Sequence, residues 1–392
     1  MKYIALVLLL FYSSSATALD TIRICSYNVL SLSSKDKEHR RNRFIPIMAY
    51  IKPDVLIGTD VEDITGAGTL TYALSLAHGL IPSFMPFHDG PDTDNMIAYN
   101  RNRIYLEEYN KYVPTNLRDI SVNKIRSYNG SETISIFGVN FTDGNTPEGE
   151  AARLKEVKIL KKLFPENEHF IITGTFNFYS STESGYLELM GDSLIIDPLG
   201  AWQRDSPHYA QFYTTSTRKQ SNTWDDCGQG SPGGMTDRLD FIFFSKNLAD
   251  NYVPLSFTIV GNDGIDRRGL AIDNPANLKY QQLAADLRCA SDHLPLFADF
   301  VLNKPVSVAN NEGHRDIKVI QTSESISISF PYTDQAYNQT ITVTDILGRT
   351  ILLSHVYEPY WTLERSGLPR GVYIISVYSD KISMIFPVTI LD

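Results

Sequence analysis

The sequence predicts an α/β protein in which two β-sheets form a sandwich flanked by helices, followed by a small all-β domain. Three observations predict this architecture. Short β-rich segments mix with a few helix-like segments across residues 21–302, and such strands and helices bury their apolar faces only in layers. A polar break follows at residues 303–316. Residues 317–392 then show almost pure β alternation, which is typical of a small all-β domain.

Length and charge limit the class of protein. The chain has 392 residues, enough for two domains at about 100–200 residues each. Apolar residues make up 43% and charged residues 20%, so the chain is neither disordered nor fibrous. The formal net charge of −10 argues against holding nucleic acid through bulk charge. A nuclease stays open, because a bound divalent cation brings its own positive charge to a site.

The first 18 residues have the pattern of a secretory signal peptide. Lys2 supplies the charged start, residues 4–12 the short apolar run, and Ala16-Thr17-Ala18 a small-residue cleavage site. The apolar run is shorter than the roughly 20 residues that span a bilayer. The alternative is a buried first strand. We expect a protein that is secreted or held on the outer cell surface, with no transmembrane segment after signal removal.

The elements expected in the first domain, residues 19–302, are strands bounded by turn residues and two helices. The strands are residues 21–30, 54–60, 95–99, 133–141, 169–174, 239–245 and 294–302. The helices are residues 41–51 and 148–163. The second helix begins with acidic residues and carries a broad apolar face.

The chain has three cysteines, which leaves one thiol over if two of them pair. Cys25 lies in the first apolar strand, where we expect a small buried hydrophobe. Cys227 and Cys289 lie in polar segments and either pair or stay free. Both flank segments that should meet, so we expect their Cα atoms within the roughly 7 Å that a disulfide allows.

Carboxylate and amide side chains that could take part in catalysis lie at the ends of the expected strands. Asn28 ends the first strand, and Asp60 and Glu62 end the second, on one face if the strand period of two persists. The other members of this set are Asn177, Asp240, Asp292 and His293. An Asp beside a His allows a carboxylate to hold a hard cation while an imidazole moves a proton. Any one of these residues alone is more often explained by a role in a turn. The hypothesis therefore rests on the whole set in its order along the chain.

In that order the set resembles the endonuclease/exonuclease/phosphatase superfamily. The family pattern runs S-[YWF]-N-V, P-D-[IV], a strand ending in His, G-D-[FL]-N, R-[IL]-D-[YF]-[IF] and S-D-H-x-P. The matching segments are Ser26-Tyr27-Asn28-Val29, Pro53-Asp54-Val55, Val139-Asn140, Gly174-Thr175-Phe176-Asn177, residues 238–242 and residues 291–295. Residues 92–95, 177–181 and 261–264 resemble a secreted bacterial branch of this family.

The resemblance implies a deoxyribonuclease-like two-sheet α/β sandwich and metal-assisted hydrolysis of a phosphoester. It implies that Asn28, Asp60 and Asp292 help to hold Mg²⁺ or Mn²⁺. Asn177 would contact the phosphate. His293, oriented by Asp240, would act on the phosphoryl group as an acid, a base or a hydrogen-bond donor.

Three positions depart from the family pattern. Thr175 stands where the family has the Asp of G-D-[FL]-N, so a hydroxyl replaces the carboxylate credited with activating water. Asn140 stands where a strand should end in His, and an amide carries no proton at neutral pH. Asp60 replaces a longer metal-binding Glu. Losing one acid–base group typically costs about 10²–10⁴ in rate.

Residues 317–392, the last 76 of the chain, resemble a different family. Asp345-Ile346-Leu347-Gly348-Arg349 and Leu368-Pro369-Arg370-Gly371-Val372-Tyr373 resemble the sorting domain of type IX secretion cargo. The basic residue usual near the terminus of that family is missing here. The resemblance implies an export address that the type IX secretion machinery recognises and removes. The alternative is a generic immunoglobulin-like module.

Two hypotheses of function follow. The first is a secreted metal-dependent phosphoester hydrolase acting on nucleic acid, with phospholipid head groups or sugar phosphates as other substrates. The second is a catalytically impaired surface or binding protein on the same fold. Asn28, Asn177 and His293 favour the first hypothesis, whereas Thr175 and Asn140 favour the second.

Overall fold

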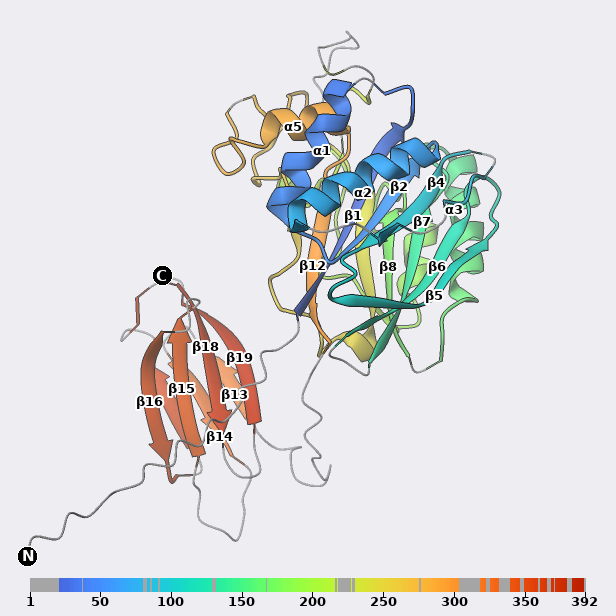
Figure 1. Ribbon diagram of the computed structural model, residues 1–392. Coiled ribbons are helices and arrows are strands. Elements are labelled where there is room, and N and C mark those ends of the chain that lie inside the picture. Colours follow the sequence, from blue (N-terminus) through green and yellow to red (C-terminus); the bar gives the residue numbers. More distant parts are fainter. Residues whose placement is uncertain are drawn as a thin grey trace, which may run out of the picture. The chain divides into compact units, whose positions relative to one another are not determined.

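The chain forms two compact units, Met1–Lys304 and Pro305–Asp392 (Figure 1). The structure is a computed structural model. It describes residues 21–36, 38–79, 83–84, 87–90, 92–128, 132–166, 168–215, 217, 227, 230–274, 276–302, 318–321, 325–330, 339–345, 349–358, 360–364, 368–369, 371–378 and 383–390. The predicted signal peptide and the predicted linker lie outside the described residues.

Two six-stranded sheets form the first unit. One sheet has the order β11-β12-β1-β2-β4-β3. Its strands are β1 (Thr21–Leu32), β2 (Val55–Val61), β3 (Ser83–Phe84), β4 (Asp94–Tyr99), β11 (Thr258–Ile259) and β12 (Leu296–Val301). The other sheet has the order β5-β6-β7-β8-β10-β9. Its strands are β5 (Ile104–Val113), β6 (Ile120–Ser127), β7 (Thr133–Asn140), β8 (His169–Thr175), β9 (Ile195–Ile196) and β10 (Asp240–Ser245).

Each sheet contains one parallel pair of strands, β1 with β2 and β7 with β8. A parallel pair needs a crossover, which α1 (Glu38–Ile51) and α3 (Pro147–Lys161) supply. Asn28 lies opposite Thr59 in the first pair, and Asn140 lies opposite Thr175 in the second. The carboxyl ends of these strands therefore carry polar side chains in both sheets.

Strand alternation separates two cores. Ile134 and Ile136 of β7 belong to one cluster with Ile57 of β2, between the sheets. Phe137 and Val139 point the other way and share a second cluster with Val157 of α3. Figure 1 shows α1, α2 and α5 over the first sheet and α3 over the second. This is a mixed α/β sandwich with helices outside, as the sequence predicts.

The predicted elements of this unit are present, with ends shifted by up to three residues. The sequence missed α2 (Ile64–His78), in which glycine and threonine dilute helix propensity. Asp63 caps this helix by accepting from the Thr65 and Gly66 amides at 2.9 Å each. The remaining helices are α4 (Ser184–Met190), α5 (Ala284–Ala290), and the 3₁₀-helices η1 (Pro207–Phe212) and η2 (Lys246–Leu248).

The second unit is β-rich, and it contains two sheets. The three-stranded sheet, in the order β13-β14-β17, holds β13 (Lys318–Gln321), β14 (Ser325–Ser329) and β17 (Tyr360–Glu364). The four-stranded sheet, in the order β16-β15-β18-β19, holds β15 (Gln339–Asp345), β16 (Thr350–Val356), β18 (Gly371–Tyr378) and β19 (Ser383–Ile390). A separate apolar cluster includes Ile328, Ile341 and Ile375. The small β-rich region that the sequence predicts is confirmed.

Parts of the two sorting-like motifs are described. The Asp345 carboxylate accepts from the Arg349 amide at 3.0 Å and from Arg349 Nε at 2.6 Å. The Tyr373 hydroxyl donates to the Pro369 carbonyl at 2.8 Å. These contacts tie motif residues to the turns around β15 and β18. Within the part of the chain that the structure describes, no helix is long and apolar enough to cross a membrane.

Candidate active site

Buried polar side chains from four strands meet where β1, β2 and β8 end and β10 begins. Asn28 Nδ2 donates to Thr175 Oγ1 at 3.0 Å. Thr59 Oγ1 lies 3.2 Å from the same oxygen. Thr175 Oγ1 donates in turn to Asp240 Oδ1 at 2.8 Å. The Thr175 hydroxyl therefore joins the two sheets, and its hydrogen-bonding capacity is filled.

Asp240 is paired with His293, as the sequence predicts. His293 Nδ1 lies 2.7 Å from Asp240 Oδ2, and Thr214 Oγ1 donates to the same carboxylate oxygen at 2.7 Å. Burial lowers the pKa of His293, but the neighbouring carboxylates, Asp240 first among them, together outweigh burial and raise the pKa to about 9. Asp292 and Asp60 add to the rise. His293 is thus an imidazolium at neutral pH, with Nε2 available to a substrate.

A tight turn after β8 presents Asn177 at the same edge. Gly174 has a φ of +135°, and a Cβ there would lie 2.0 Å from the Val139 carbonyl oxygen, so no other residue fits. Asn177 has a φ of +54°, a left-handed conformation that Asn tolerates. Its Nδ2 donates to the Phe141 carbonyl at 2.6 Å. One N–H of the amide is therefore held by the loop that follows β7.

Ser291 and Asp292 lie beside the end of β1. Ser291 Oγ donates to the Asn28 carbonyl at 2.8 Å, which ties the segment before β12 to the first strand. Asp292 is 2% exposed, and its Oδ2 accepts from the Ser231 amide at 2.6 Å. Asp292 Oδ1 is buried with no hydrogen-bond partner among the described residues. A buried carboxylate oxygen without a donor is suited to a cation or a water.

Asp60 ends β2 in a left-handed conformation, with a φ of +62°. Its Oδ1 accepts from Ser31 Oγ at 3.3 Å. The irregular backbone shifts the strand register here, so the prediction that Asp60 and Glu62 share one face is wrong. Glu62 instead pairs with Lys35 at the exposed surface, 2.6 Å from its Nζ. Glu62 therefore does not supplement Asp60.

Asn140 lies at the end of β7, opposite Thr175 in the parallel pair. The residue is 4% exposed. Its Nδ2 is a buried donor with no hydrogen-bond partner in the described part of the chain. The family pattern has an imidazole at this position, whereas the amide here holds no proton to transfer.

The side-chain oxygens that could bind a hard cation are those of Asn28, Asp60 and Asp292. Across the described residues, no group of three or more His, Cys, Asp or Glu side chains is arranged to hold a metal. Asp292 Oδ1, a buried carboxylate oxygen without a hydrogen-bond partner among the described residues, is the atom of this set best suited to such a cation. Asn28 Oδ1 is partly committed, because it accepts from the Leu30 amide at 3.0 Å. Mg²⁺ typically takes one or two carboxylates and keeps several waters.

A cavity of about 520 Å³ lies between the segment that follows Asn177 and residues 202–209, and none of the predicted site residues lines it. Its lining includes Asn145, Tyr179, Ser180, Thr182, Gln203 and Arg204. Arg204 forms an ion pair with Asp237 at 2.8 Å. The Asp237 carbonyl accepts from the Thr214 amide at 2.9 Å, and Thr214 holds Asp240. Arg204 of the cavity wall is thereby linked, through Asp237 and Thr214, to the Asp240 that binds His293.

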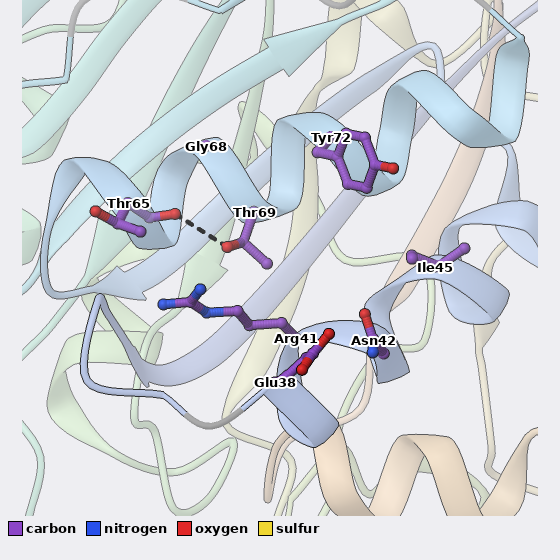
Figure 2. Close-up of a pocket in the computed structure, with 8 residues that line it drawn as sticks. All are labelled: Glu38, Arg41, Asn42, Ile45, Thr65, Gly68, Thr69 and Tyr72. Carbon is purple, nitrogen blue, oxygen red and sulfur yellow. Dashed lines mark hydrogen bonds between the residues drawn. The ribbon is translucent and has the colours of Figure 1, made fainter.

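Another cavity, of about 550 Å³, lies between α1 and α2 (Figure 2). Arg41 of α1 extends toward Thr65 of α2 in this view, and Arg41 Nη2 donates to the Ser34 carbonyl at 3.0 Å. Thr69 Oγ1 donates to the Thr65 carbonyl at 3.0 Å. None of the predicted site residues lines this cavity.

The sequence did not identify three residues that complete the site. Thr59 contacts Thr175, Thr214 holds Asp240, and the Ser231 amide holds Asp292. Thr59 directly precedes Asp60, so a strand-end pattern that included hydroxyls would have found it. Thr214 and Ser231 lie in irregular segments, where no periodicity marks them.

The predicted proximity of Cys227 and Cys289 is confirmed. The two residues form a disulfide with a Cα–Cα distance of 4.5 Å. Cys25 is free and fully buried, as expected for a core residue. Burial raises the pKa of the Cys25 thiol well above its usual value, which keeps this cysteine unreactive.

Residues 25–293 match the Endonuclease/Exonuclease/phosphatase family. The matched segment covers more than half of the chain and carries every residue of the site described above, so the chain belongs to this family. Enzymes of this family generally use a divalent metal. No curated protein matches the chain.

Several solved structures are similar to the chain. D. rerio TDP2 complexed with a single-strand DNA product is 17% identical, with 73% of this chain and 100% of that chain covered, at a TM-score of 0.47. An endonuclease/exonuclease/phosphatase family protein from Bacteroides thetaiotaomicron is 14% identical, with 73% and 100% covered, at a TM-score of 0.45. A functionally unknown protein from Enterococcus faecalis V583 is 13% identical, with 72% and 100% covered, at a TM-score of 0.47.

Proposed function

We propose that this chain is a secreted, metal-dependent phosphoester hydrolase with a partly degenerate site. The observation that supports the proposal is the buried Asp240–His293 pair, 2.7 Å apart, at the edge that also carries Asn28, Asp60 and Asn177. An imidazolium held by a carboxylate beside oxygen ligands can stabilise the charge that develops on a phosphoryl group during hydrolysis. Family membership supports the same reaction class.

Each residue has a separate role in this proposal. Asp60, the Asn28 amide oxygen and the unpaired oxygen of Asp292 would hold Mg²⁺ or Mn²⁺. When bound, the cation neutralises charge on the phosphate and lowers the pKa of a bound water. His293 donates through Nε2 to a phosphoryl oxygen. Asn177 offers its second amide N–H to the phosphate, because Phe141 takes only one.

The cavity that begins at Tyr179, two residues after Asn177, is where the group attached to the phosphate would lie. Its lining offers hydroxyl and amide groups, the aromatic rings of Tyr179, Trp202 and Tyr209, and one guanidinium, which is paired with Asp237. This chemistry suits a neutral, hydroxyl-bearing unit such as the sugar of a nucleotide. Nucleic acid is therefore the first substrate class to test, before phospholipid head groups and sugar phosphates.

A second candidate function is a catalytically impaired surface or binding protein on the same fold. The Thr175 hydroxyl supports this candidate, because it already donates to Asp240 and cannot accept a proton from water. Asn140 supports it as well, since no imidazole replaces the missing one. Efficient turnover would need another group to activate the attacking water.

A metal-dependence assay separates the two candidates. The purified protein is incubated with bis(4-nitrophenyl) phosphate and with plasmid DNA, in Mg²⁺, Mn²⁺ or EDTA. The proposal expects slow hydrolysis that EDTA abolishes and that His293→Ala lowers by about 10²-fold or more. Hydrolysis that survives EDTA would contradict the metal-dependent reading. No hydrolysis under any condition would favour the binding protein.

We also propose that residues 1–18 are a signal peptide and that residues 317–392 are a type IX sorting domain. The Asp345–Arg349 and Tyr373–Pro369 contacts support the second assignment, because motif residues shape the turns of a small β unit. A sorting domain is removed after export. Intact-mass analysis of the cell-surface form should give a chain that ends before Ile317. A full-length exterior chain would support an immunoglobulin-like module instead.

A further inference from the structure

The cavity that begins at Tyr179 lies between two segments that are bound to each other. The Ser181 amide and the Ser181 hydroxyl both donate to the Trp202 carbonyl, at 3.3 Å and 2.9 Å. Ser180 and Gln203 form an antiparallel bridge. The cavity volume of about 520 Å³ is in the range of roughly 300–1,000 Å³ that is usual for small-molecule sites. Since backbone contacts hold both walls, the cavity is formed before any ligand binds.

Tyr179 is fixed in its wall by a buried ion pair. Its amide donates to Glu183 Oε2 at 3.0 Å, and Glu183 Oε1 lies 2.6 Å from Arg153 Nε. Arg153 is 1% exposed and Glu183 is 6% exposed. The guanidinium carbons of Arg153 and Arg204 lie 5.2 Å and 5.1 Å from the centre of the Tyr179 ring. A ring that is already fixed loses little conformational entropy when a flat group packs beside it.

The charges around the cavity are balanced. Arg204, whose side chain is 38% exposed, pairs with Asp237 through Nε at 2.8 Å and donates to it through Nη2 at 3.3 Å. The Ser180 and Thr182 hydroxyls lie 2.9 Å apart and bind each other. Among the described residues, Arg204 is the one charged side chain that lines the cavity. The lining therefore favours a neutral group over a second phosphate.

Two carboxamides in the lining have no partner in the described part of the chain. Asn145 and Gln203 are both exposed, and no described residue hydrogen-bonds to either side-chain amide. A carboxamide holds a donor and an acceptor side by side, so it can form two hydrogen bonds to the edge of one nucleobase, as it does with adenine. Trp202 is 2% exposed, and its Nε1 is a donor without an acceptor among the described residues. A nucleobase is neutral and flat, and its edge carries matching donors and acceptors.

We propose that this cavity binds the nucleobase of the substrate and that Asn145 and Gln203 determine which base is accepted. The base stacks beside the Tyr179 ring and the Arg204 guanidinium, since both are flat groups on which bases pack. The two carboxamides hydrogen-bond to the edge of the base. The effect on turnover rests on the proposed phosphoester hydrolase function, whereas binding of the base does not.

The hydrolysis experiment varies only the base. The full-length protein is given 4-nitrophenyl esters of the four deoxynucleoside phosphates and of abasic deoxyribose phosphate, in a 5′ series and a 3′ series, with Mg²⁺. In one series we expect kcat/KM for the preferred base to exceed the abasic value by about 10-fold or more, because stacking and edge contacts are both lost. We expect kcat/KM to differ by about 10-fold among the four bases.

The variants separate specificity from structure. Asn145→Ala/Gln203→Ala should reduce the spread among the four bases to about 3-fold or less, whereas damage to the fold alone lowers all four values in proportion. Helix α3 should persist in this variant, because Thr146 caps it by accepting from the Gly149 amide at 3.2 Å. Asn102→Ala removes an exposed carboxamide from the turn between β4 and β5, and this matched control should keep the native ratios.

Base binding is also measured without turnover. The four deoxynucleosides are titrated into the protein in EDTA and followed by saturation-transfer NMR. We expect base-dependent binding that Tyr179→Ala weakens by about 10-fold and that Tyr179→Phe, which keeps the ring, holds within about 3-fold of the native value.

The outcomes are separable. In an active protein, equal kcat/KM for the four bases and the abasic ester in both series would overturn the proposal. Native ratios in a folded Asn145→Ala/Gln203→Ala variant would overturn it as well. A native protein that hydrolyses no ester would refute the proposed function, and the deoxynucleoside titration would still decide: no binding would overturn the base pocket. Should Tyr179→Ala fail to fold, the carboxamide variant decides in the same titration, through loss of the differences among bases.

Discussion

Thr175 Oγ1 donates a hydrogen bond of 2.8 Å to Asp240 Oδ1. Thr175 occupies the position at which the family pattern has an aspartate. The other oxygen of the same carboxylate, Asp240 Oδ2, binds His293 and raises the pKa of that imidazole. An aspartate at position 175 would instead place a second carboxylate against Asp240. Thr175 thus donates to Asp240, whereas the group credited in the family with activating water is missing.

Replacing Thr175 with Val should destabilise the first unit. Asn28 Nδ2 would lose its acceptor and Asp240 Oδ1 its donor, and each buried unpaired group costs about 1–3 kcal/mol. We expect the free energy of unfolding in urea to fall by about 2–4 kcal/mol. Thr133→Val, at the half-buried start of β7, is the control and should change stability by less than about 1 kcal/mol. Equal effects of the two variants would show that the Thr175 hydroxyl is not a structural hub.

Restoring the family residues should raise activity. The triple variant Thr175→Asp, Asn140→His, Asp60→Glu returns a carboxylate, an imidazole and a longer metal ligand. We expect metal-dependent hydrolysis of bis(4-nitrophenyl) phosphate to rise by at least about 10²-fold, the low end for one positioned acid–base group. Thr175→Asp alone should be less stable than the native protein, since two carboxylates then meet at Asp240. A well-folded triple variant with native activity would show that the substrate loops are also altered.

Removing the Asp240 carboxylate should lower the pKa of His293. Asp240 is the group that raises this pKa to about 9 against the effect of burial, so Asp240→Asn leaves burial opposed only by Asp292 and Asp60. We expect an NMR titration of the His293 ring to show a fall of more than about 1 unit. Because the folded-state pKa lies above the usual 6.5, protonation of His293 stabilises the native protein fully below pH 6.5, and this stabilisation is lost as pH rises through 9. Asp205→Asn, at an exposed ion pair, is the control that should leave the titration unchanged.

Asp94 makes stability fall as pH rises. The residue is 3% exposed, and burial raises the pKa of its carboxyl from 3.8 to about 6, although the Gly90 amide donates to it. The folded state therefore binds this proton more tightly than the unfolded state does. The resulting stabilisation is complete below pH 3.8 and is lost as pH rises through about 6.

Asp94→Asn should remove this dependence. Its free energy of unfolding at pH 7.5 should exceed that of the native protein by about 1–2 kcal/mol, and the two proteins should converge near pH 4. Urea titrations at both pH values measure the difference. A stability difference between Asp94→Asn and the native protein that is the same at both pH values would contradict the raised pKa of Asp94.

The sequence predicted the site where regular strands carry it. Asn28 and Asp240 stand at the ends of strands whose apolar alternation fixes which side chains face the interior, so their convergence follows from packing. Thr175 and Asn140 were placed by the same alternation. The expected sandwich and the β-rich second unit follow from hydrophobic patterning as well.

Prediction failed where the backbone leaves its regular period. Asp60 adopts a φ of +62°, which turns Glu62 away toward Lys35, and no alternation rule anticipates such a residue. The Thr214 and Ser231 contacts come from irregular segments brought in by the whole fold. α2 was missed because its helix depends on the Asp63 cap and on packing rather than on propensity.

The turn at Gly174 bears on how relatives of this chain should be sorted by activity. A side chain at this position would collide with the Val139 carbonyl, so the glycine is demanded by the β7–β8 contact, whether or not any phosphate is cleaved. Asn177 is similarly favoured by its left-handed backbone and by its bond to Phe141. The backbone conformation thus requires Gly174 and favours Asn177, so relatives that have lost activity should still retain both residues. Asn140 meets no such demand, because its Nδ2 has no hydrogen-bond partner among the described residues, so we expect position 140 to follow activity more closely than positions 174 and 177 do.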